Sequence, residues 1–435
     1  MKVLSLFSGI GAFEKALDNM GVPCDLVAFC EIDKYASRSY AAIHGVSEAM
    51  NLGDIIKVDE KILPKDIDLI TYGFPCQDIS LAGKQKGLFN ADGTQTRSGL
   101  FFEALRIIEE TQPRVAIAEN VKNLTSKKFA VQFKIVLDSL KAAGYNNYWQ
   151  VLNSKDYGVP QNRERVFIVS IRKDIDNGKF KFPDAIPLEL RLKDMLEYDV
   201  DEKFYLDGKF ETITTVNEHY SMLNGGVIGR MHDISRRVYN ADYVAPSLHT
   251  CGGGNLEPKV AVETKVTAAA MRGRYDENGV VQQNIEVSDR EYANALTTVQ
   301  KDSMVALSEN KTNADKPVCL NSKGGRGGVD GLQPSVQDRV YDSDAIATAV
   351  TASFMPSYTD KTRIRKLTPK ECFRLMGFDD TDFEKAEAVN SNTQLYKQAG
   401  NSIVVDVVQC ITKSLLECGV FGLENEEATD ETKRD

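Results

Sequence analysis

The chain has 435 residues, of which 42% are hydrophobic and 27% charged, and a formal net charge of −10. This composition predicts a globular protein of one large or two medium domains, and no apolar run is long enough to span a bilayer. Eight cysteines without a Cys-x-x-Cys pair, and only four histidines, argue against a zinc site or a disulfide framework and favour a reducing cytoplasm. The acidic balance does not indicate nucleic-acid binding, although a local basic cleft can lie on an acidic protein.

The N-terminal segment predicts the start of an α/β sheet with a nucleotide-like cofactor. A strand is predicted at 3–7, a Ser-Gly-Ile-Gly turn at 8–11 and a helix at 12–20. This order commonly forms a cofactor site, although many α/β proteins keep such a turn for packing. Glu31 ends the next predicted strand, about 20 residues further on, and suits ribose hydroxyls. The alternative for Glu31 is a solvated carboxylate or a helix cap.

Asp54 stands at the edge of a predicted third strand, in the segment 51–55. A carboxylate at that place has two uses. It either caps a helix or accepts a hydrogen bond from an adenine amine.

A thiol and a carboxyl follow the next two predicted strands. The apolar run 68–72 leads into Gly73-Phe74-Pro75-Cys76, and the run 115–118 ends in Glu119. Both side chains would then lie at the carboxyl edge of the sheet, where open α/β sheets bind their ligands. Burial would keep Glu119 protonated and able to act as an acid. The alternative for Cys76 is a buried, inert cysteine.

Two arginines stand between two strands that are predicted to form a hairpin, at 149–152 and 166–171. Arg163 and Arg165 alternate on an extended segment, so they are expected to face the same side. Paired guanidiniums suit a carboxylate, a phosphate or a base edge, and a surface salt bridge is the alternative.

The composition changes between about residue 190 and residue 360, where Gly, Thr, Asn and Asp dominate and predict short strands and loops. A degenerate unit recurs three times in this region: a Gly/Arg patch, an Arg-x-Tyr step and an apolar run that ends in threonine. The threonines are Thr250, Thr298 and Thr351. Repeats about 50 residues apart usually form stacked supersecondary units.

Regular patterning returns near residue 365. Thr368 and Pro369 predict a helix start, with threonine as the N-cap and proline in the first turn. The segment 398–402 is expected to open a last helix over 403–416. The acidic segment 424–435 is predicted to be disordered.

Five motifs, taken together, resemble the DNA (cytosine-5) methyltransferase family. Each is weak alone, but all five occur in the family's order, and the variable region lies between the last two. The resemblance covers about 1–175 and 365–415, and its motifs are Phe7-Ser8-Gly9-Ile10-Gly11, Gly73-Phe74-Pro75-Cys76-Gln77, Glu119-Asn120-Val121, Gln161-Asn162-Arg163-Glu164-Arg165 and Gln398-Ala399-Gly400-Asn401-Ser402.

The resemblance implies a Rossmann-like α/β methyltransferase domain, with a mostly irregular or β target-recognition domain inserted before the last helix. The expected divisions are a catalytic domain at 1–190, a target-recognition domain with degenerate repeats at 191–360, a return to the catalytic domain at 361–423 and an acidic tail at 424–435.

The same resemblance implies a mechanism. Cytosine C5 is a poor nucleophile, and addition of the Cys76 thiolate at C6 activates it, in a site expected to favour the thiolate. Glu119 would hold N3 and the exocyclic amine and supply a proton. Arg165 would bind the carbonyl oxygen, while Arg163 would support the thiol loop and the target. The base must leave the duplex, because its C6 face is stacked inside DNA.

The implied cofactor is S-adenosylmethionine, with S-adenosylhomocysteine as product and no metal. Its expected contacts are Phe7, Gly9, Gly11, Glu31, Ile32, Asp54, Leu100 and Asn401. Some family members carry an aromatic residue at the position of Ile32, so adenine stacking is expected to be weaker here. The expected contacts with double-stranded DNA are Gln77, Ser80, Lys84, Arg97, Arg230, Arg274 and Arg326. A cytoplasmic monomer that requires no cognate restriction endonuclease and no membrane is expected.

Three other functions compete with this reading. A tRNA-modifying RNA cytosine-5 methyltransferase has similar catalytic motifs, but its recognition region is small. A catalytically dead DNA-binding protein would not need the intact thiol, carboxyl and arginine motifs. A dinucleotide oxidoreductase would need the third glycine of its fingerprint, which is absent here.

Overall fold

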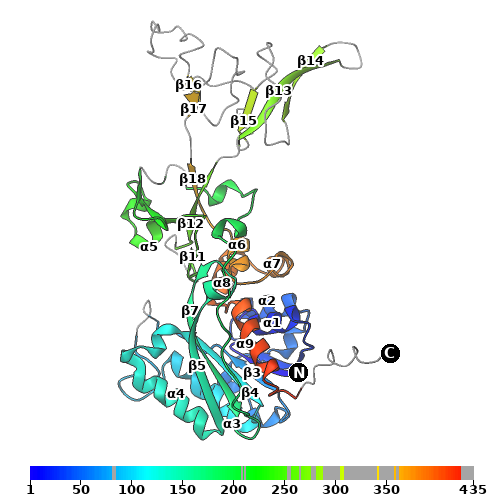
Figure 1. Cartoon of the computed structure of the whole chain (residues 1–435), viewed down its shortest axis with the longest axis vertical. Coiled ribbons are helices and arrows are strands. Elements are labelled where there is room, and N and C mark those ends of the chain that lie inside the picture. Colours follow the sequence, from blue (N-terminus) through cyan, green and yellow to red (C-terminus); the bar gives the residue numbers. More distant parts are fainter. Residues whose placement is uncertain are drawn as a thin grey trace, which may run out of the picture. The chain divides into compact units, whose positions relative to one another are not determined.

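The computed structural model describes residues 1–80, 85–206, 209, 212–251, 256–263, 266–275, 281–287, 304–307, 340–341, 357–358 and 362–422 (Figure 1). The chain divides into two compact units. The larger comprises Met1–Phe204, Gly208–Val260 and Lys366–Asp435, and the smaller comprises Tyr205–Asp207 and Ala261–Arg365. Over the part of the chain that the structure describes, no helix has the length and apolar character needed to cross a membrane.

A six-stranded sheet in the order β2-β1-β3-β4-β7-β5 forms the centre of the larger unit. The first four strands are parallel, whereas β7 runs antiparallel to both of its neighbours. The strands are β1 Lys2–Leu6, β2 Asp25–Cys30, β3 Leu69–Tyr72, β4 Val115–Val121, β5 Tyr145–Asn153 and β7 Glu164–Arg172. This α/β sheet confirms the predicted fold class, and the pairing of β5 with β7 confirms the predicted hairpin.

Helices cover both faces of this sheet (Figure 1). Alternate strand residues point to opposite faces, and one apolar cluster joins strand residues such as Leu4 and Ile70 to Ile107 of α3 and Val136 of α4. On the other side, α1 packs against α9. The helices are α1 Ala12–Asn19, α2 Lys34–His44, α3 Phe101–Thr111, α4 Ala130–Ala142 and α9 Val405–Glu417. The parallel strands therefore bring the loops after β1, β2, β3 and β4 to one edge.

The third strand predicted beside Asp54 does not form. Asn51 makes one isolated bridge with Phe29, and Asp54 Oδ1 instead accepts a hydrogen bond from the Ile56 amide at 3.2 Å, at the start of a short 3-10 turn. An aspartate before a turn favours capping over strand pairing, because its side chain satisfies the backbone amide locally.

Short strands make up the described part of the middle region, as predicted. In the larger unit, β9 pairs with β8 and β10, and β10 also pairs with the start of β12. In the smaller unit, β13 pairs with β14 and β15, and β16 pairs with β17. The second and third Thr-ended runs lie outside the described residues. The remaining elements up to residue 366 are β6 Gln161–Asn162, β8 Thr212–Thr215, β9 Tyr220–Asn224, α5 Asp233–Arg236, β10 Arg237–Tyr239, β11 Ala245–Pro246, β12 Lys259–Glu263, β13 Val266–Tyr275, β14 Val281–Val287, β15 Met304–Leu307, β16 Val340–Tyr341, β17 Ser357–Tyr358 and β18 Thr362–Lys366.

Helices α6 Pro369–Arg374, α7 Asp380–Glu387 and α8 Asn392–Asn401 precede α9. Thr368 caps α6 in a capping box with Glu371, which confirms the predicted start. The prediction for 398–402 is wrong: this segment closes α8, and the last helix begins at Val405. The helix ends there because Ser402 takes an extended conformation, with φ −69° and ψ 163°.

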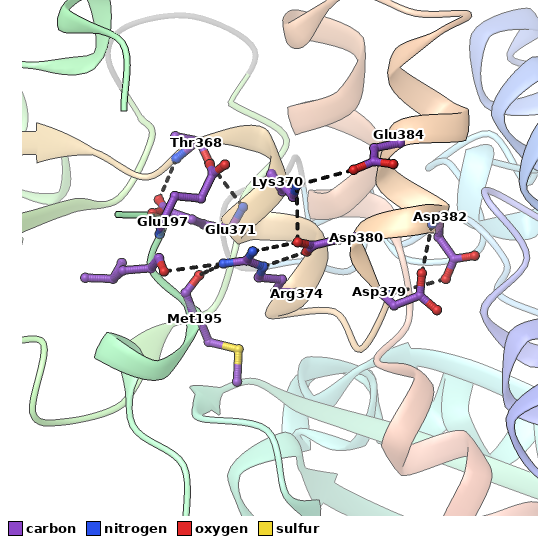
Figure 2. Close-up of polar contacts among 11 residues, drawn as sticks. Met195, Glu197, Thr368, Lys370, Glu371, Arg374, Asp379, Asp380, Asp382 and Glu384 are labelled. Carbon is purple, nitrogen blue, oxygen red and sulfur yellow. Dashed lines mark hydrogen bonds and ion pairs between the residues drawn. The ribbon is translucent and has the colours of Figure 1, made fainter. Parts of the chain in front are cut away.

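A polar network fastens residues 195–197, near the start of the middle region, to α6 and α7 (Figure 2). Arg374 binds both carboxylate oxygens of Asp380, each at 2.7 Å, and donates to the Met195 carbonyl at 3.1 Å. The Glu197 amide donates to Glu371 at 2.7 Å. A paired guanidinium and carboxylate of this geometry hold the two segments in one orientation.

Candidate active site

Glu119 and Arg165 meet at the carboxyl edge of the sheet. Glu119 lies near the end of β4, and Arg165 stands on β7 opposite Val121. The Arg165 Nε atom is 2.9 Å from Glu119 Oε1, and the two side chains are 19% and 12% exposed. A Cβ atom at Gly73 would lie 3.6 Å from Glu119 Oε2, so the backbone that leads to Cys76 runs directly past the carboxylate.

Two asparagines hold the turn that carries Cys76. Asn120 donates to the Phe74 carbonyl at 2.9 Å, and Asn123 donates to the Ile79 carbonyl at 2.5 Å. The Ile79 amide donates to the Cys76 carbonyl at 2.9 Å, which closes the turn. Asn123 was missed in the sequence, because it lies two residues beyond the end of β4 and only the folded turn brings it to Ile79.

Burial has the largest effect on the pKa values of Glu119 and Cys76. It raises the pKa of Glu119, against the opposing effect of Arg165 and Arg163. Burial, followed by the charge of Glu119, also raises the pKa of the Cys76 thiol, and the two arginines lower it. The expectation of a favoured thiolate is therefore wrong for the protein without substrate, because desolvation outweighs the cations. The pKa values of both groups are therefore raised in the protein without substrate, while Arg165 stays paired with Glu119.

The two arginines do different things. Arg165 pairs with Glu119, whereas Arg163 is buried and donates to backbone carbonyls. Its Nη1 binds the Leu248 oxygen at 3.1 Å, and its Nη2 binds the oxygens of Gly400 and Ser402 at 3.0 and 2.6 Å. The predicted pair of guanidiniums facing one ligand is thus replaced by one arginine at the carboxyl and one arginine joined to the backbone.

A cavity of about 40 Å³ connects the predicted cofactor residues to this edge. Phe7 and Gly9 line it from the loop after β1, Gly73 from the loop after β3, Glu119 from β4 and Asn401 from the end of α8. One cavity therefore joins three predicted cofactor contacts to the Glu119 carboxyl.

The loop after β1 is built to leave room beside it. Gly9 has φ +56°, and a Cβ atom there would meet no atom of the described residues within 4 Å. Glu31 accepts from the amides of Gly9 and Asp33 at 2.9 and 2.8 Å. Burial raises its pKa, and these two amides oppose the rise. Ile32 is 75% exposed at the same edge. A carboxylate, an open glycine and an exposed apolar side chain fit the ribose and adenine of a nucleoside cofactor.

Other predicted cofactor contacts have structural partners of their own. A Cβ atom at Gly11 would lie 2.0 Å from the His44 ring, so this glycine allows α1 and α2 to approach. Leu100 is half-buried and packs on the core between the sheet and α3. Asp54 caps a turn. A role at the cofactor stays a prediction for all three.

The predicted DNA contacts are only partly described. Gln77 and Arg97 are exposed and bond to each other at 3.1 Å, and Ser80 is half-buried in the thiol turn. Arg230 is exposed at the end of a short turn, and Arg274 is described by its backbone in β13. Lys84 and Arg326 lie outside the described residues. All of these contacts stay predictions.

Comparison with known proteins gives the following matches. The family model of the C-5 cytosine-specific DNA methylase matches residues 1–417. The chain is 37% identical to the orphan methyltransferase M.SPRI of Bacillus phage SPR, over 96% of this chain and 97% of that protein. It is 34% identical to the orphan methyltransferase M.SPBetaI of Bacillus phage SPbeta, over the same shares. A solved Entamoeba histolytica methyltransferase, EhMeth, shares the fold at 12% identity, with a TM-score of 0.53 over 96% of this chain and 98% of that one.

Proposed function

The chain belongs to the C-5 cytosine-specific DNA methylase family and is a DNA (cytosine-5) methyltransferase, and on that premise we propose how it works. It transfers the methyl group of S-adenosylmethionine to C5 of a cytosine turned out of a specific double-stranded DNA sequence, through a covalent bond between Cys76 and C6. The observation that carries this proposal is the Glu119–Arg165 pair beside the Gly73 backbone that leads to Cys76, at one end of the cavity that Phe7, Gly9 and Asn401 line.

Cys76 and Glu119 activate the base together. The Cys76 thiol gives its proton to solvent water, and its sulfur adds to C6, which moves the C5–C6 electron pair to C5. Glu119 holds a proton at cytosine N3, where negative charge would otherwise build up. When Glu119 is neutral it no longer opposes the thiolate, and the charges of Arg165 and Arg163 then favour ionisation of the sulfur. The raised pKa of both groups is therefore compatible with one shared activation step.

The residues at the cofactor end are suited to the proposed methyl donor. Glu31 accepts hydrogen bonds from the ribose hydroxyls, Phe7 and Ile32 contact the adenine, and Asn401 lies at the methionine end. S-adenosylmethionine, once bound, supplies an electrophilic methyl group. After the transfer, loss of the C5 proton expels the Cys76 sulfur from C6, which restores the aromatic ring and the free thiol.

The oligomeric state of the enzyme, its location and its independence from a nuclease are also part of this proposal. It acts as a monomer in the cytoplasm and methylates without a cognate nuclease, in line with the name "orphan" of its phage relatives. The competing hypothesis is that the enzyme methylates cytosine in RNA instead of DNA.

Bisulfite sequencing of DNA and tRNA from cells that express the protein tests the substrate and the reaction. We expect methylated cytosines at fixed duplex DNA sequences and an unchanged tRNA pattern. Methylation confined to tRNA, or none in either nucleic acid with a soluble, folded enzyme, would contradict the proposal.

A further inference from the structure

Arg163 joins three segments that are far apart in the sequence. It stands between β6 and β7, and it donates to Leu248, within the middle region, and to Gly400 and Ser402, at the end of α8. It is 2% exposed. Its two terminal nitrogens serve the two sides separately: Nη1 binds Leu248, and Nη2 binds Gly400 and Ser402. A single planar guanidinium therefore sets the distance between the two segments.

A second buried side chain holds the same segment. Gln161 accepts from the Leu248 amide at 3.2 Å and donates to the Leu375 carbonyl at 2.7 Å. Beside it, the Ala245 amide donates to the Pro160 carbonyl at 2.7 Å, within the pairing of β11 with β6. Both backbone groups of Leu248 are thus bonded to the strand that carries the arginine motif.

Gly400 touches the next peptide of this segment. A Cβ atom at Gly400 would lie 2.3 Å from the His249 oxygen and 2.6 Å from the Thr250 nitrogen. Both atoms belong to the backbone, so they cannot move away as a side-chain tip can. The absence of a side chain at Gly400 lets the end of α8 pack directly on the His249–Thr250 peptide.

The end of α8, which Arg163 and Gly400 hold against the segment 245–251, also borders the cofactor cavity. Asn401 and Ser402 line that cavity, and they follow Gly400 directly. Arg163 therefore connects a wall of the cavity to the segment 245–251, which lies within the predicted target-recognition region 191–360. A change in the position of either side must act on the other, because buried and bonded backbone transmits displacement.

We propose that Arg163 is a positioning residue that couples occupation of the cofactor cavity to the placement of the segment 245–251, so that cofactor and DNA raise each other's affinity. The proposal rests on the proposed function, since it names the cavity's ligand and the DNA of that reaction. Coupling of this kind is reciprocal, and about 5-fold or more is expected where two sites share one bonded element.

Calorimetric titration with S-adenosylhomocysteine tests the coupling, without DNA and with a saturating duplex that carries the methylated sequence found by mapping. In the wild type, the duplex should tighten binding by about 5-fold or more. The quantity compared is the affinity ratio, which is the affinity for S-adenosylhomocysteine with the duplex divided by the affinity without it. Arg163→Lys keeps the charge, but one ammonium replaces two separate nitrogens, so this affinity ratio should fall to about 1. Gly400→Ala, which pushes the two backbones apart, should lower the ratio in the same way.

Gln161→Met is the matched control. The methionine cannot form the hydrogen bond with the Leu248 amide or the one with the Leu375 carbonyl, next to α6. Every contact of Arg163 with the cavity wall remains. Its melting temperature should fall while the affinity ratio persists. Equal loss of the ratio in Gln161→Met and Arg163→Lys would show general loosening and overturn the proposal, as would a wild-type ratio of 1.

Hydrogen exchange of the wild type keeps the proposal testable if the variants do not fold. S-adenosylhomocysteine alone should slow amide exchange within 245–251, although Asn401 and Ser402, not this segment, line its cavity. Unchanged exchange at saturating ligand would overturn the coupling. Failure of the proposed function looks different: the protein would not bind S-adenosylhomocysteine at all.

Discussion

Cys76 and Glu119 show that local environment sets the chemistry of single residues. A thiol at a strand end is ordinary, but here burial and a neighbouring carboxyl raise its pKa. The same burial raises the pKa of Glu119. Burial thus disfavours the charged form of each group, and the charges of Arg165 and Arg163 oppose this effect.

Cys76→Ser should abolish methyl transfer while DNA binding survives, because a hydroxyl is far less ionised than a thiol at neutral pH. Incubation with S-adenosylmethionine and 5-fluorocytosine DNA should give a denaturation-resistant adduct in the wild type only. An adduct with the serine variant, or unchanged turnover, would remove Cys76 from its assigned role.

Glu119→Gln and Glu31→Ala should separate the two functions of the sheet edge. The glutamine keeps the shape of Glu119 but lacks its titratable proton, so turnover should fall with cofactor affinity nearly intact. Glu31→Ala should weaken S-adenosylmethionine binding by about 1–3 kcal/mol, the cost of lost hydrogen bonds to a charged group. Calorimetric titration of both variants with the cofactor measures these affinities. Loss of cofactor binding in Glu119→Gln together with unchanged binding in Glu31→Ala would show that the two roles are misassigned.

Helices α6 and α7 depend on a charged pair whose effect on stability varies with pH. The hydrogen bonds from Arg374 lower the pKa of Asp380 from 3.8 to about 2, despite partial desolvation. The folded value lies below the unfolded one, so the stabilisation is present above about pH 4 and is lost as the pH falls toward 2.

Asp380→Asn should therefore lower the melting temperature at neutral pH and reduce its dependence on acid between about pH 4 and 2. Because Asp380 is 42% exposed, the expected loss is about 1 kcal/mol or less. Circular dichroism melts over this range measure it. Asp174→Asn is the control, because Asp174 also pairs with an arginine but lies away from α6 and α7. Identical melting curves for the wild type and Asp380→Asn would contradict a stabilising role of the Arg374–Asp380 pair.

At the scale of the whole molecule, the proposed function divides the work between the central sheet and the region that follows residue 190. In this proposal the sheet provides the thiol, the carboxyl and the cofactor cavity. The middle region carries Gly/Arg patches, and glycine allows close approach to a duplex while arginine suits the O6 and N7 atoms of guanine. The alternative is that the repeats only pack on one another and their arginines contact phosphates or solvent.

Arg230→Ala, Arg274→Ala and Arg326→Ala should distinguish these two roles in genome-wide methylation maps. Loss of an arginine that reads a base should relax one position of the site, at about 1–3 kcal/mol, whereas loss of a phosphate contact weakens all sequences alike. A uniform decrease with an unchanged motif in all three variants would reject base recognition by these arginines.

The order of strands, turns and motifs is a property of the sequence alone. Apolar runs such as 68–72 and 115–118 predicted buried strands, because such runs are stable only between two helical layers. Parallel strands that end in Cys76 and Glu119 then had to share one sheet edge. The α/β sheet followed from this linear pattern, and the enzyme family followed from the resemblance of five ordered motifs to the DNA (cytosine-5) methyltransferases.

Only the tertiary structure decided what each polar group contacts. Arg163 and Arg165 are two positions apart, yet one lies among backbone carbonyls from residues 248, 400 and 402, and the other pairs with Glu119. The end of α8, where a helix start was predicted, and the raised pKa of Cys76 also depend on residues distant in sequence. Hydrogen bonding and desolvation are set by neighbours in space, so a pattern along the chain names the groups, and the packed fold determines their partners and their charge.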